Sequence, residues 1–197
     1  MKPGIKYALL VISAILLLAA AIFTYKYLTS VTTVPPSPPD NRSSAPTATG
    51  EANGSVKKNT APDFTVLDSN GKTVRLSEKF GKPIVINFWA TWCPPCKQEL
   101  PDFDKLGKEY GDRIVFMMIN LTDGYRDTVD GTKRFVSDKG YTFPVYFDTE
   151  SSGAGAYKVI SIPQTTFIDA DGNVYKTHIG AMSEETLRLY LDALLGG

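Results

Sequence analysis

The chain has 197 residues, of which 43% are hydrophobic, and this is enough for one packed domain with additional segments. Lys+Arg and Asp+Glu are equal at 21 each, so no basic field favours nucleic acid and we expect no such partner. Two cysteines are too few for a multi-disulfide scaffold, or for a structural zinc site made of four cysteines.

The first 28 residues predict a membrane anchor. Residues 7–25, "YALLVISAILLLAAAIFTY", form an uncharged stretch of 19 residues, and a helix of this length spans about 28 Å. Lys2 and Lys6 precede the stretch and only Lys26 follows it closely, which places the N-terminus in the cytoplasm. The alternative is a signal peptide cleaved at the alanines of 19–21. We expect an uncleaved, single-pass anchor in the cell membrane, with the remaining chain extracytoplasmic.

Residues 29–60 are rich in Pro, Ser, Thr, Asn and Gly and contain almost no large apolar side chains. Such a segment cannot offset its ordering entropy by burial, so it predicts a disordered linker. The composition changes at Ala61, and residues 61–197 predict a folded domain.

The domain begins with two short strand patterns around Asn70-Gly71, which indicate a hairpin. The apolar run 83–90 predicts a buried strand, and a helix is expected from about Pro94 to Tyr110. Further elements follow in chain order: a strand over 113–121, a helix near 131–139, a strand over 143–148, a hairpin over 165–180 that turns at Asp171-Gly172, and a final helix capped by Ser183. This order predicts an α/β domain with a mixed central sheet flanked by helices.

Cys93 and Cys96 lie where the apolar strand 83–90 gives way to a helix, in "WCPPCK". A helix N-terminus stabilises a thiolate at Cys93, and Lys97 adds a nearby positive charge. The thiolate attacks disulfides, and the second cysteine resolves the mixed disulfide. The pair therefore predicts a redox-active disulfide.

Two other uses of a cysteine pair compete with this prediction. A zinc site needs further ligands, and the chain offers one histidine, His178, and no third cysteine, so we expect no metal. A purely structural disulfide closing so short a loop removes little entropy from the unfolded chain.

The stretch "VINFWATWCPPCKQELP" resembles the signature of the TlpA/ResA group of membrane-anchored, thioredoxin-like thiol-disulfide oxidoreductases. The resemblance covers residues 61–197 and includes "YKVISIPQTTFIDADGNV", where the family carries a cis-proline. It implies a thioredoxin-like fold with an N-terminal hairpin. It also implies that Cys93 is the nucleophile, Cys96 the buried resolving thiol, Pro163 the cis-proline and Ile162 a source of backbone groups for a substrate peptide.

Three further positions follow from this resemblance. Trp92 either flanks the disulfide and guides substrates or packs in the core. Asn87 stands where thioredoxins proper place a buried proton-accepting aspartate, and an amide cannot take a proton. In the ResA-like branch an acid in an Asn-x-x-Glu stretch is expected to do this work. The corresponding stretch here, Asn120 to Asp123, makes Asp123 the predicted acceptor; a solvated loop aspartate is the alternative.

The predicted activity is a thiol-disulfide oxidoreductase that reduces disulfide-containing proteins such as apocytochrome c, with electrons from a membrane thiol donor and no bound cofactor. A peroxiredoxin is one alternative, but neither cysteine has Thr three positions and Pro seven positions before it. A copper or haem chaperone is another, but no methionine or histidine lies within the motif to complete a soft-metal site.

Overall fold

The computed structural model describes residues 17–18, 22 and 59–196. Most of the predicted anchor (1–28) and almost all of the predicted linker (29–60) lie outside the described residues, so both stay predictions. None of the helices in the described part of the chain combines the length and the apolar character needed to cross a bilayer.

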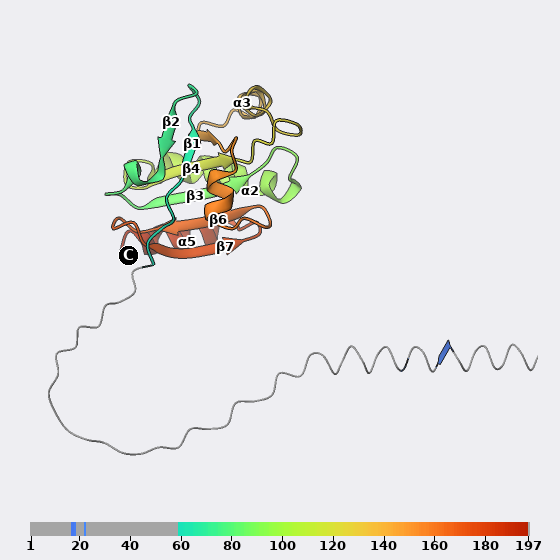
Figure 1. Cartoon of the computed structure of the whole chain (residues 1–197). Helices are drawn as coiled ribbons and strands as arrows, with labels where there is room; N and C mark the ends of the chain where they lie inside the picture. Colours follow the sequence, from blue (N-terminus) through green and yellow to red (C-terminus); the bar gives the residue numbers. More distant parts are fainter. Residues whose placement is uncertain (1–16, 19–21, 23–58, 197) are drawn as a thin grey trace, which may run out of the picture. The chain divides into compact units, whose positions relative to one another are not determined.

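The folded domain is built on one seven-stranded mixed sheet with the strand order β2-β1-β5-β4-β3-β6-β7 (Figure 1). β3 is an interior strand that pairs in parallel with β4 and antiparallel with β6, and β4 pairs in parallel with β5. The strands are β1 (Thr65–Leu67), β2 (Thr73–Arg75), β3 (Ile84–Trp89), β4 (Val115–Asn120), β5 (Val145–Phe147), β6 (Gln164–Ile168) and β7 (Val174–Ile179).

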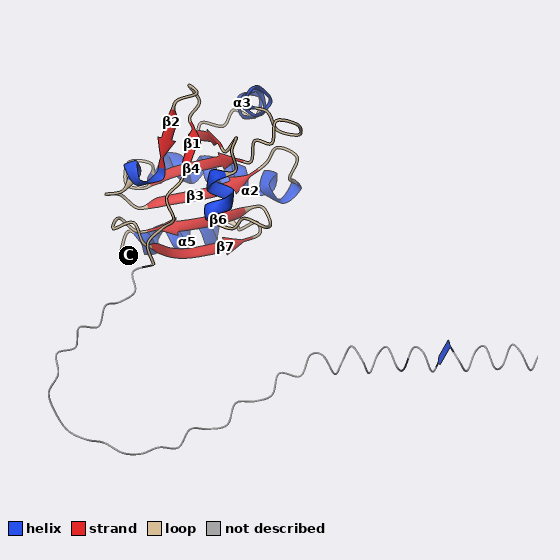
Figure 2. Ribbon diagram, viewed as in Figure 1, coloured by secondary structure: helices blue, strands red, loops and turns tan. Residues whose placement is uncertain are grey.

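Helices cover both faces of this sheet (Figure 2). Alternate residues of a strand point to opposite faces, and β3 is apolar on both. Val85 and Trp89 face a core with α2 (Pro94–Tyr110), α3 (Val129–Asp138) and α5 (Glu184–Leu194). Ile84, Ile86 and Phe88 face a second core, which includes residues of the short helices η1 (Leu76–Lys79) and α4 (Ser152–Ala156).

The structure confirms the α/β class, the mixed sheet and the main elements predicted for residues 61–197. Gly71 and Gly172, at the two predicted turns, have φ of 78° and 80°, which glycine adopts without steric cost. Ser183 caps α5, where its hydroxyl accepts a hydrogen bond from the N–H of Thr186 at 3.2 Å. The sequence did not predict α4, whose sequence SGAGA contains two glycines and has low helix propensity. Asp148 supports α4 instead, by accepting hydrogen bonds from the N–H groups of Gly153 and Ala154.

Candidate active site

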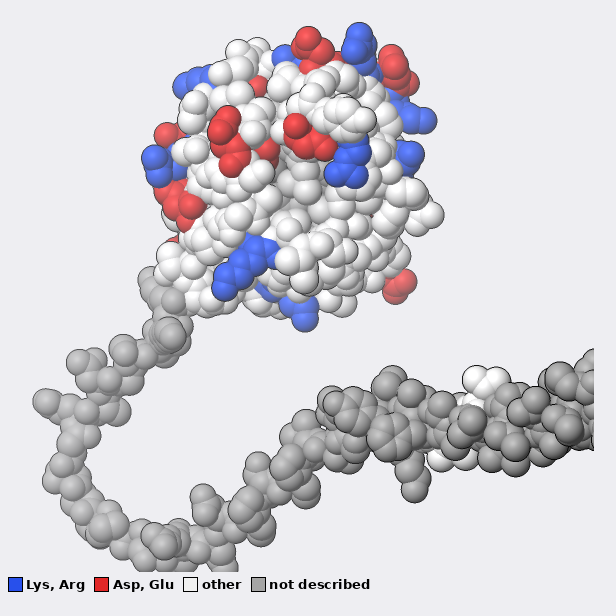
Figure 3. All heavy atoms as spheres, turned by 45° about the vertical axis from the view of Figure 1, so that its right-hand side comes forward, with Lys and Arg blue, Asp and Glu red and all other residues white. Residues whose placement is uncertain are grey.

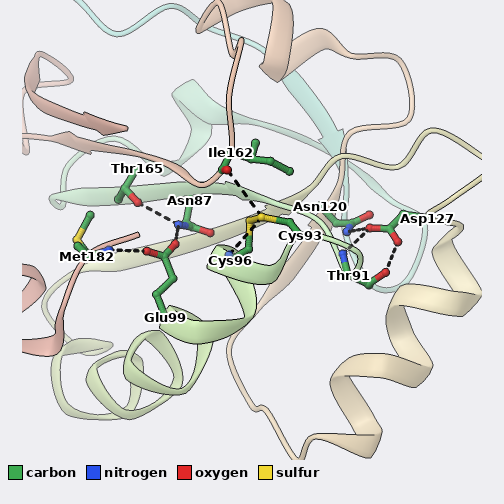
Figure 4. Close-up of a disulfide and its surroundings, with 10 residues drawn as sticks. All are labelled: Asn87, Thr91, Cys93, Cys96, Glu99, Asn120, Asp127, Ile162, Thr165 and Met182. Atoms are coloured by element: carbon green, nitrogen blue, oxygen red, sulfur yellow. Dashed lines mark hydrogen bonds between the residues drawn. A yellow bond between two sulfur atoms is a disulfide. The ribbon is translucent and has the colours of Figure 1, made fainter. Parts of the chain in front are cut away.

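A disulfide between Cys93 and Cys96, with an S–S distance of 2.05 Å, lies at the N-terminus of α2 (Figure 4). Cys93 is the N-cap residue, and its Sγ accepts a hydrogen bond from the N–H of Cys96 at 3.2 Å. Pro94 and Pro95 have no N–H to offer. The predicted disulfide and its place at the helix cap are confirmed, and the first turn supplies a single donor to the sulfur of Cys93.

The loop before β6 faces the disulfide. The Ile162–Pro163 peptide bond is cis, as predicted. The carbonyl oxygen of Ile162 lies 3.7 Å from Cys93 Sγ (Figure 4). Since the sulfur of a disulfide carries no hydrogen, this approach is a close contact in the oxidised protein, and it becomes available as a hydrogen bond when Cys93 is a thiol.

A buried polar network holds the loop that carries Cys93. The carboxylate of Asp127 accepts hydrogen bonds from the N–H of Thr91 at 2.8 Å, from the Thr91 hydroxyl and from Asn120 Nδ2 at 2.7 Å. Asp127 is only 2% exposed. The network ties the β3–α2 loop to the end of β4, so the position of the nucleophile depends on a carboxylate that the sequence analysis did not single out.

Trp92, next to the nucleophile, is 39% exposed and therefore not a core residue. The guanidinium of Arg126 lies 3.7 Å from its ring centroid, a cation–π contact. Both residues line a groove of about 290 Å³ beside the disulfide, together with Asp123 and the loop residues 159–162. Ile160 in this loop is 90% exposed, so the groove has an apolar rim. The position of Trp92 fits the predicted contact with substrates.

The charged side chains around the domain are mixed in sign. On the face shown in Figure 3, Lys and Arg are interspersed with Asp and Glu, and no continuous basic area forms. Lys97 is exposed in the first turn of α2, where its charge was predicted to favour the Cys93 thiolate. No cluster of three or more potential metal ligands occurs among the described residues.

Glu99 is a candidate functional residue that the sequence did not reveal. It is 1% exposed and lies three positions after Cys96, on the same side of α2. Its carboxylate accepts hydrogen bonds from Asn87 Nδ2 at 2.8 Å and from the N–H of Met182 at 3.0 Å. Burial raises the pKa of Glu99 to about 7, although these two donors oppose the rise. A buried carboxyl group that titrates near neutral pH next to a resolving cysteine is suited to proton transfer.

Asp123, the predicted acceptor, caps a surface turn. Its carboxylate accepts hydrogen bonds from the N–H groups of Tyr125, Arg126 and Asp127 at 2.7–3.0 Å. It also pairs with the Arg126 guanidinium at 3.2 Å. These donors, led by the N–H of Asp127, lower the pKa of Asp123 to about 2. The proton-accepting role of Asp123 stays a prediction, and the observed geometry favours Glu99 for it.

A thioredoxin-like fold with a two-cysteine disulfide at a helix N-terminus, facing a cis-proline, defines a thiol-disulfide oxidoreductase. The model of the AhpC/TSA family matches residues 58–177, more than half of the chain. The chain belongs to this family.

Individual relatives agree with this assignment. The chain is 35% identical over 132 residues to the thioredoxin-like protein YneN of Bacillus subtilis, covering 67% of this chain and 76% of the relative. It is 37% identical over 131 residues to the thiol-disulfide oxidoreductase ResA of Bacillus thuringiensis, covering 66% of this chain and 74% of that relative.

Two solved structures are similar as well. StoA from Bacillus subtilis has a TM-score of 0.58 at 26% identity over 67% of this chain and 98% of its own. A thioredoxin-family thiol:disulfide interchange protein from Chlorobium tepidum has a TM-score of 0.63 at 27% identity over 73% and 100%.

Proposed function

We propose that this thiol-disulfide oxidoreductase works outside the cytoplasm as a reductant of protein disulfides. Disulfides form by default in oxidising compartments, so a dedicated reductant is needed wherever particular thiols must stay free. The observation that carries the proposal is the single N–H donor, from Cys96, to the sulfur of Cys93. Each hydrogen bond to a charged acceptor is worth about 1.5–3 kcal/mol, so a thiolate with fewer donors is less stabilised. A less stabilised thiolate makes the reduced form less stable, which lowers the reduction potential.

The reaction proceeds in two exchanges. The Cys93 thiolate attacks a substrate disulfide, forms a mixed disulfide and releases one substrate thiolate. Cys96 then loses its proton and attacks Cys93 Sγ, which reforms the Cys93–Cys96 disulfide and releases the second substrate thiolate. Cys96 is fully buried, so its proton needs an acceptor inside the protein. We assign this role to Glu99, because its raised pKa of about 7 lets it exchange protons at neutral pH.

A redox titration of the full chain against glutathione tests the direction of the reaction. We expect a Cys93 pKa and a reduction potential nearer those of thioredoxin (about 7 and about −270 mV) than those of DsbA (about 3.5 and about −120 mV). A potential near that of DsbA would contradict the assignment as a reductant.

Variants at Pro95 test whether the small number of N–H donors in the first turn of α2 sets the Cys93 pKa and the potential. Pro95→Ala restores one N–H to the first turn, and Pro95→His restores the same N–H together with an imidazole. One added donor is expected to lower the Cys93 pKa by about one unit and to raise the potential. If Pro95→His shifts the pKa and Pro95→Ala does not, the imidazole and not the donor is responsible.

The resemblance to the TlpA/ResA group supports apocytochrome c as our leading candidate substrate and a membrane thiol carrier as the candidate electron donor. A Cys96→Ala variant cannot resolve its mixed disulfides, so partners stay covalently attached to Cys93. Recovery of an apocytochrome would support apocytochrome c as the substrate. Recovery of other secreted proteins and no apocytochrome would contradict it. Insulin reduction, peroxide turnover and copper(I) titration, run side by side, separate the reductase from the peroxidase and the metal chaperone.

The proposed location depends on the predicted anchor. We expect the mature protein to keep residue 1 and to fractionate with membranes. N-terminal sequencing of the mature protein provides the measurement, and a soluble form that begins near residue 22 would show that the anchor is cleaved.

A further inference from the structure

Asn87 lies on the face of β3 that packs against α2, the helix that carries Cys96 and Glu99. It is fully buried in β3, two residues after Val85 and two before Trp89, and both of these pack in the core that contains Cys96. Side chains two apart on a strand share a face, so Asn87 points toward α2. Cys96 and Glu99, three residues apart, lie on the side of α2 that meets this face.

The hydrogen bonds of Asn87 fix the orientation of its amide. Nδ2 donates to Glu99 Oε1 at 2.8 Å and to Thr165 Oγ1 at 3.0 Å, which uses both of its hydrogens. When Glu99 is ionised, the reversed orientation would place Oδ1 against its carboxylate, where two acceptors repel each other. The carboxylate therefore holds Oδ1 on the side away from Glu99.

Asn87 Oδ1 is buried and has no hydrogen-bond partner within the described part of the chain. Figure 4 shows this oxygen directed toward the Cys93–Cys96 disulfide, opposite to the Glu99 side of the amide. A buried acceptor without a donor is destabilising, so its presence calls for an explanation. In the oxidised protein neither sulfur carries a hydrogen, and no donor is available from that side.

We infer that Asn87 is a positioning residue for the second exchange, with its Oδ1 accepting a hydrogen bond from the Cys96 thiol in the reduced protein. Reduction breaks the S–S bond and adds two electrons and two protons, which supplies the missing donor at Cys96. One rigid amide then holds the Cys96 S–H on one side and the Glu99 carboxylate on the other. In the resolving step the Cys96 S–H leaves Oδ1, its S–H bond breaks and an O–H bond forms at Glu99, while the amide itself neither gains nor loses a proton. The Cys96–Cys93 bond replaces the bond between Cys93 and the substrate, which leaves as a thiolate. The inference rests on the proposed role of Glu99 only for the destination of the proton.

The infrared S–H stretch of Cys96 provides the direct test. In a Cys93→Ser variant of the full chain Cys96 is the only thiol, because the sequence has two cysteines. We expect its S–H band at the lowered frequency of a hydrogen-bonded thiol. Adding Asn87→Leu, which keeps the approximate volume and removes the acceptor, should move the band to the frequency of a free thiol. Adding Thr165→Val instead removes the other partner of the same amide and should leave the band in place.

A band that does not move on Asn87→Leu would overturn the inference. If Asn87→Leu fails to fold, the native protein still gives an answer through the 13Cγ signal of the Asn87 side chain. Reduction should shift this signal as Oδ1 gains a donor, and a signal that is the same in both redox states would contradict the inference.

The kinetic consequence is specific to one step. Asn87→Leu removes both the acceptor that orients the Cys96 thiol and the donor that holds the Glu99 carboxylate. In a folded variant we therefore expect lost positioning to slow the resolving step by about tenfold, so that the mixed disulfide with substrate accumulates while the first attack by Cys93 keeps its rate. Equal slowing of both steps would indicate a general structural role and would overturn the inference. The S–H band is measured without any substrate. Its result therefore does not depend on whether the protein acts as a reductase or on whether Glu99 is the proton acceptor.

Discussion

Two carboxylates near the disulfide, one inside the domain and one on its surface, differ in almost every respect that controls a proton. Glu99 is buried on the inner side of α2, where its carboxylate accepts two hydrogen bonds, and its pKa is raised to about 7. Asp123 lies in an exposed turn with three backbone N–H donors and a guanidinium, and its pKa is lowered to about 2. Both are acids close to the redox site, but only Glu99 is near its titration point at neutral pH.

The difference shows how the site divides its work. On the surface side, Asp123 fixes the turn that leads to Asp127, and Asp127 holds Thr91 and thereby the loop that carries Cys93. On the inner side, the amide of Asn87 holds the Glu99 carboxylate in the same core as the buried Cys96. Many donors make a carboxylate a stable anchor, whereas burial with few donors keeps a carboxyl group ready to bind a proton.

The largest effect is expected at Glu99. Glu99→Gln removes the proposed proton acceptor, so we expect the resolving step at pH 7 to slow by about 100-fold, the usual range for loss of a general base. Rapid-quench measurement of mixed-disulfide decay gives this rate. Glu109→Gln, an exposed position at the other end of α2, is the control and should keep the parental rate. If mixed-disulfide decay in Glu99→Gln keeps the parental rate, Glu99 is not the proton acceptor.

The same variant has a signature in stability. Burial raises the pKa of Glu99 from 4.5 to about 7, so the folded state binds the proton more tightly than the unfolded state does. The parent therefore loses stability as pH rises from about 4.5 to about 7, by on the order of 3 kcal/mol. Glu99→Gln lacks this titration and should be more stable than the parent at pH 8, with the difference fading toward pH 4. Parallel denaturation curves at the two pH values would argue against a raised pKa.

Asp127→Ala tests the surface side of the comparison and should cost about 2 kcal/mol. It leaves the N–H of Thr91 and Asn120 Nδ2 without their acceptor in a buried environment. We expect a lower urea midpoint and a slower first attack by Cys93, because the loop that positions it loosens. Asp130→Ala, an exposed acid in the first turn of α3, is the matched control and should cost only a few tenths of a kcal/mol. Equal effects of the two variants would show that Asp127 does not position the loop that carries Cys93.

The sequence predicted the fold well because local signals determine most of it. Gly71 and Gly172 mark their turns, and the expected bounds of the helix after Cys93, Pro94 to Tyr110, agree with α2. The sequence did not reveal Glu99 because it ends the polar run Lys97-Gln98-Glu99, which is typical of a solvated helix surface. Its burial depends on the packing of α2 against β3 and on the backbone of Met182, which lies 83 residues away. The asparagine at position 87 gave only part of the answer. An amide in place of the aspartate implied that the proton acceptor is a different residue, but it did not indicate which one.

Asp123→Asn is expected to have the smallest effect, and it decides between the two carboxylates. An asparagine side chain still accepts hydrogen bonds from the N–H groups of the turn, and only the exposed ion pair with Arg126 is lost. We therefore expect an exchange rate within about twofold of the parent at pH 6–8, and a slightly lower melting temperature. The folded pKa of Asp123 is depressed to about 2 from 3.8, so its contribution to stability is present above pH 4 and is lost as the pH falls through about 2. The difference in melting temperature should shrink accordingly on acidification. Slowing of mixed-disulfide decay as large as that of Glu99→Gln would instead restore Asp123 as the proton acceptor and leave Glu99 a buried structural group.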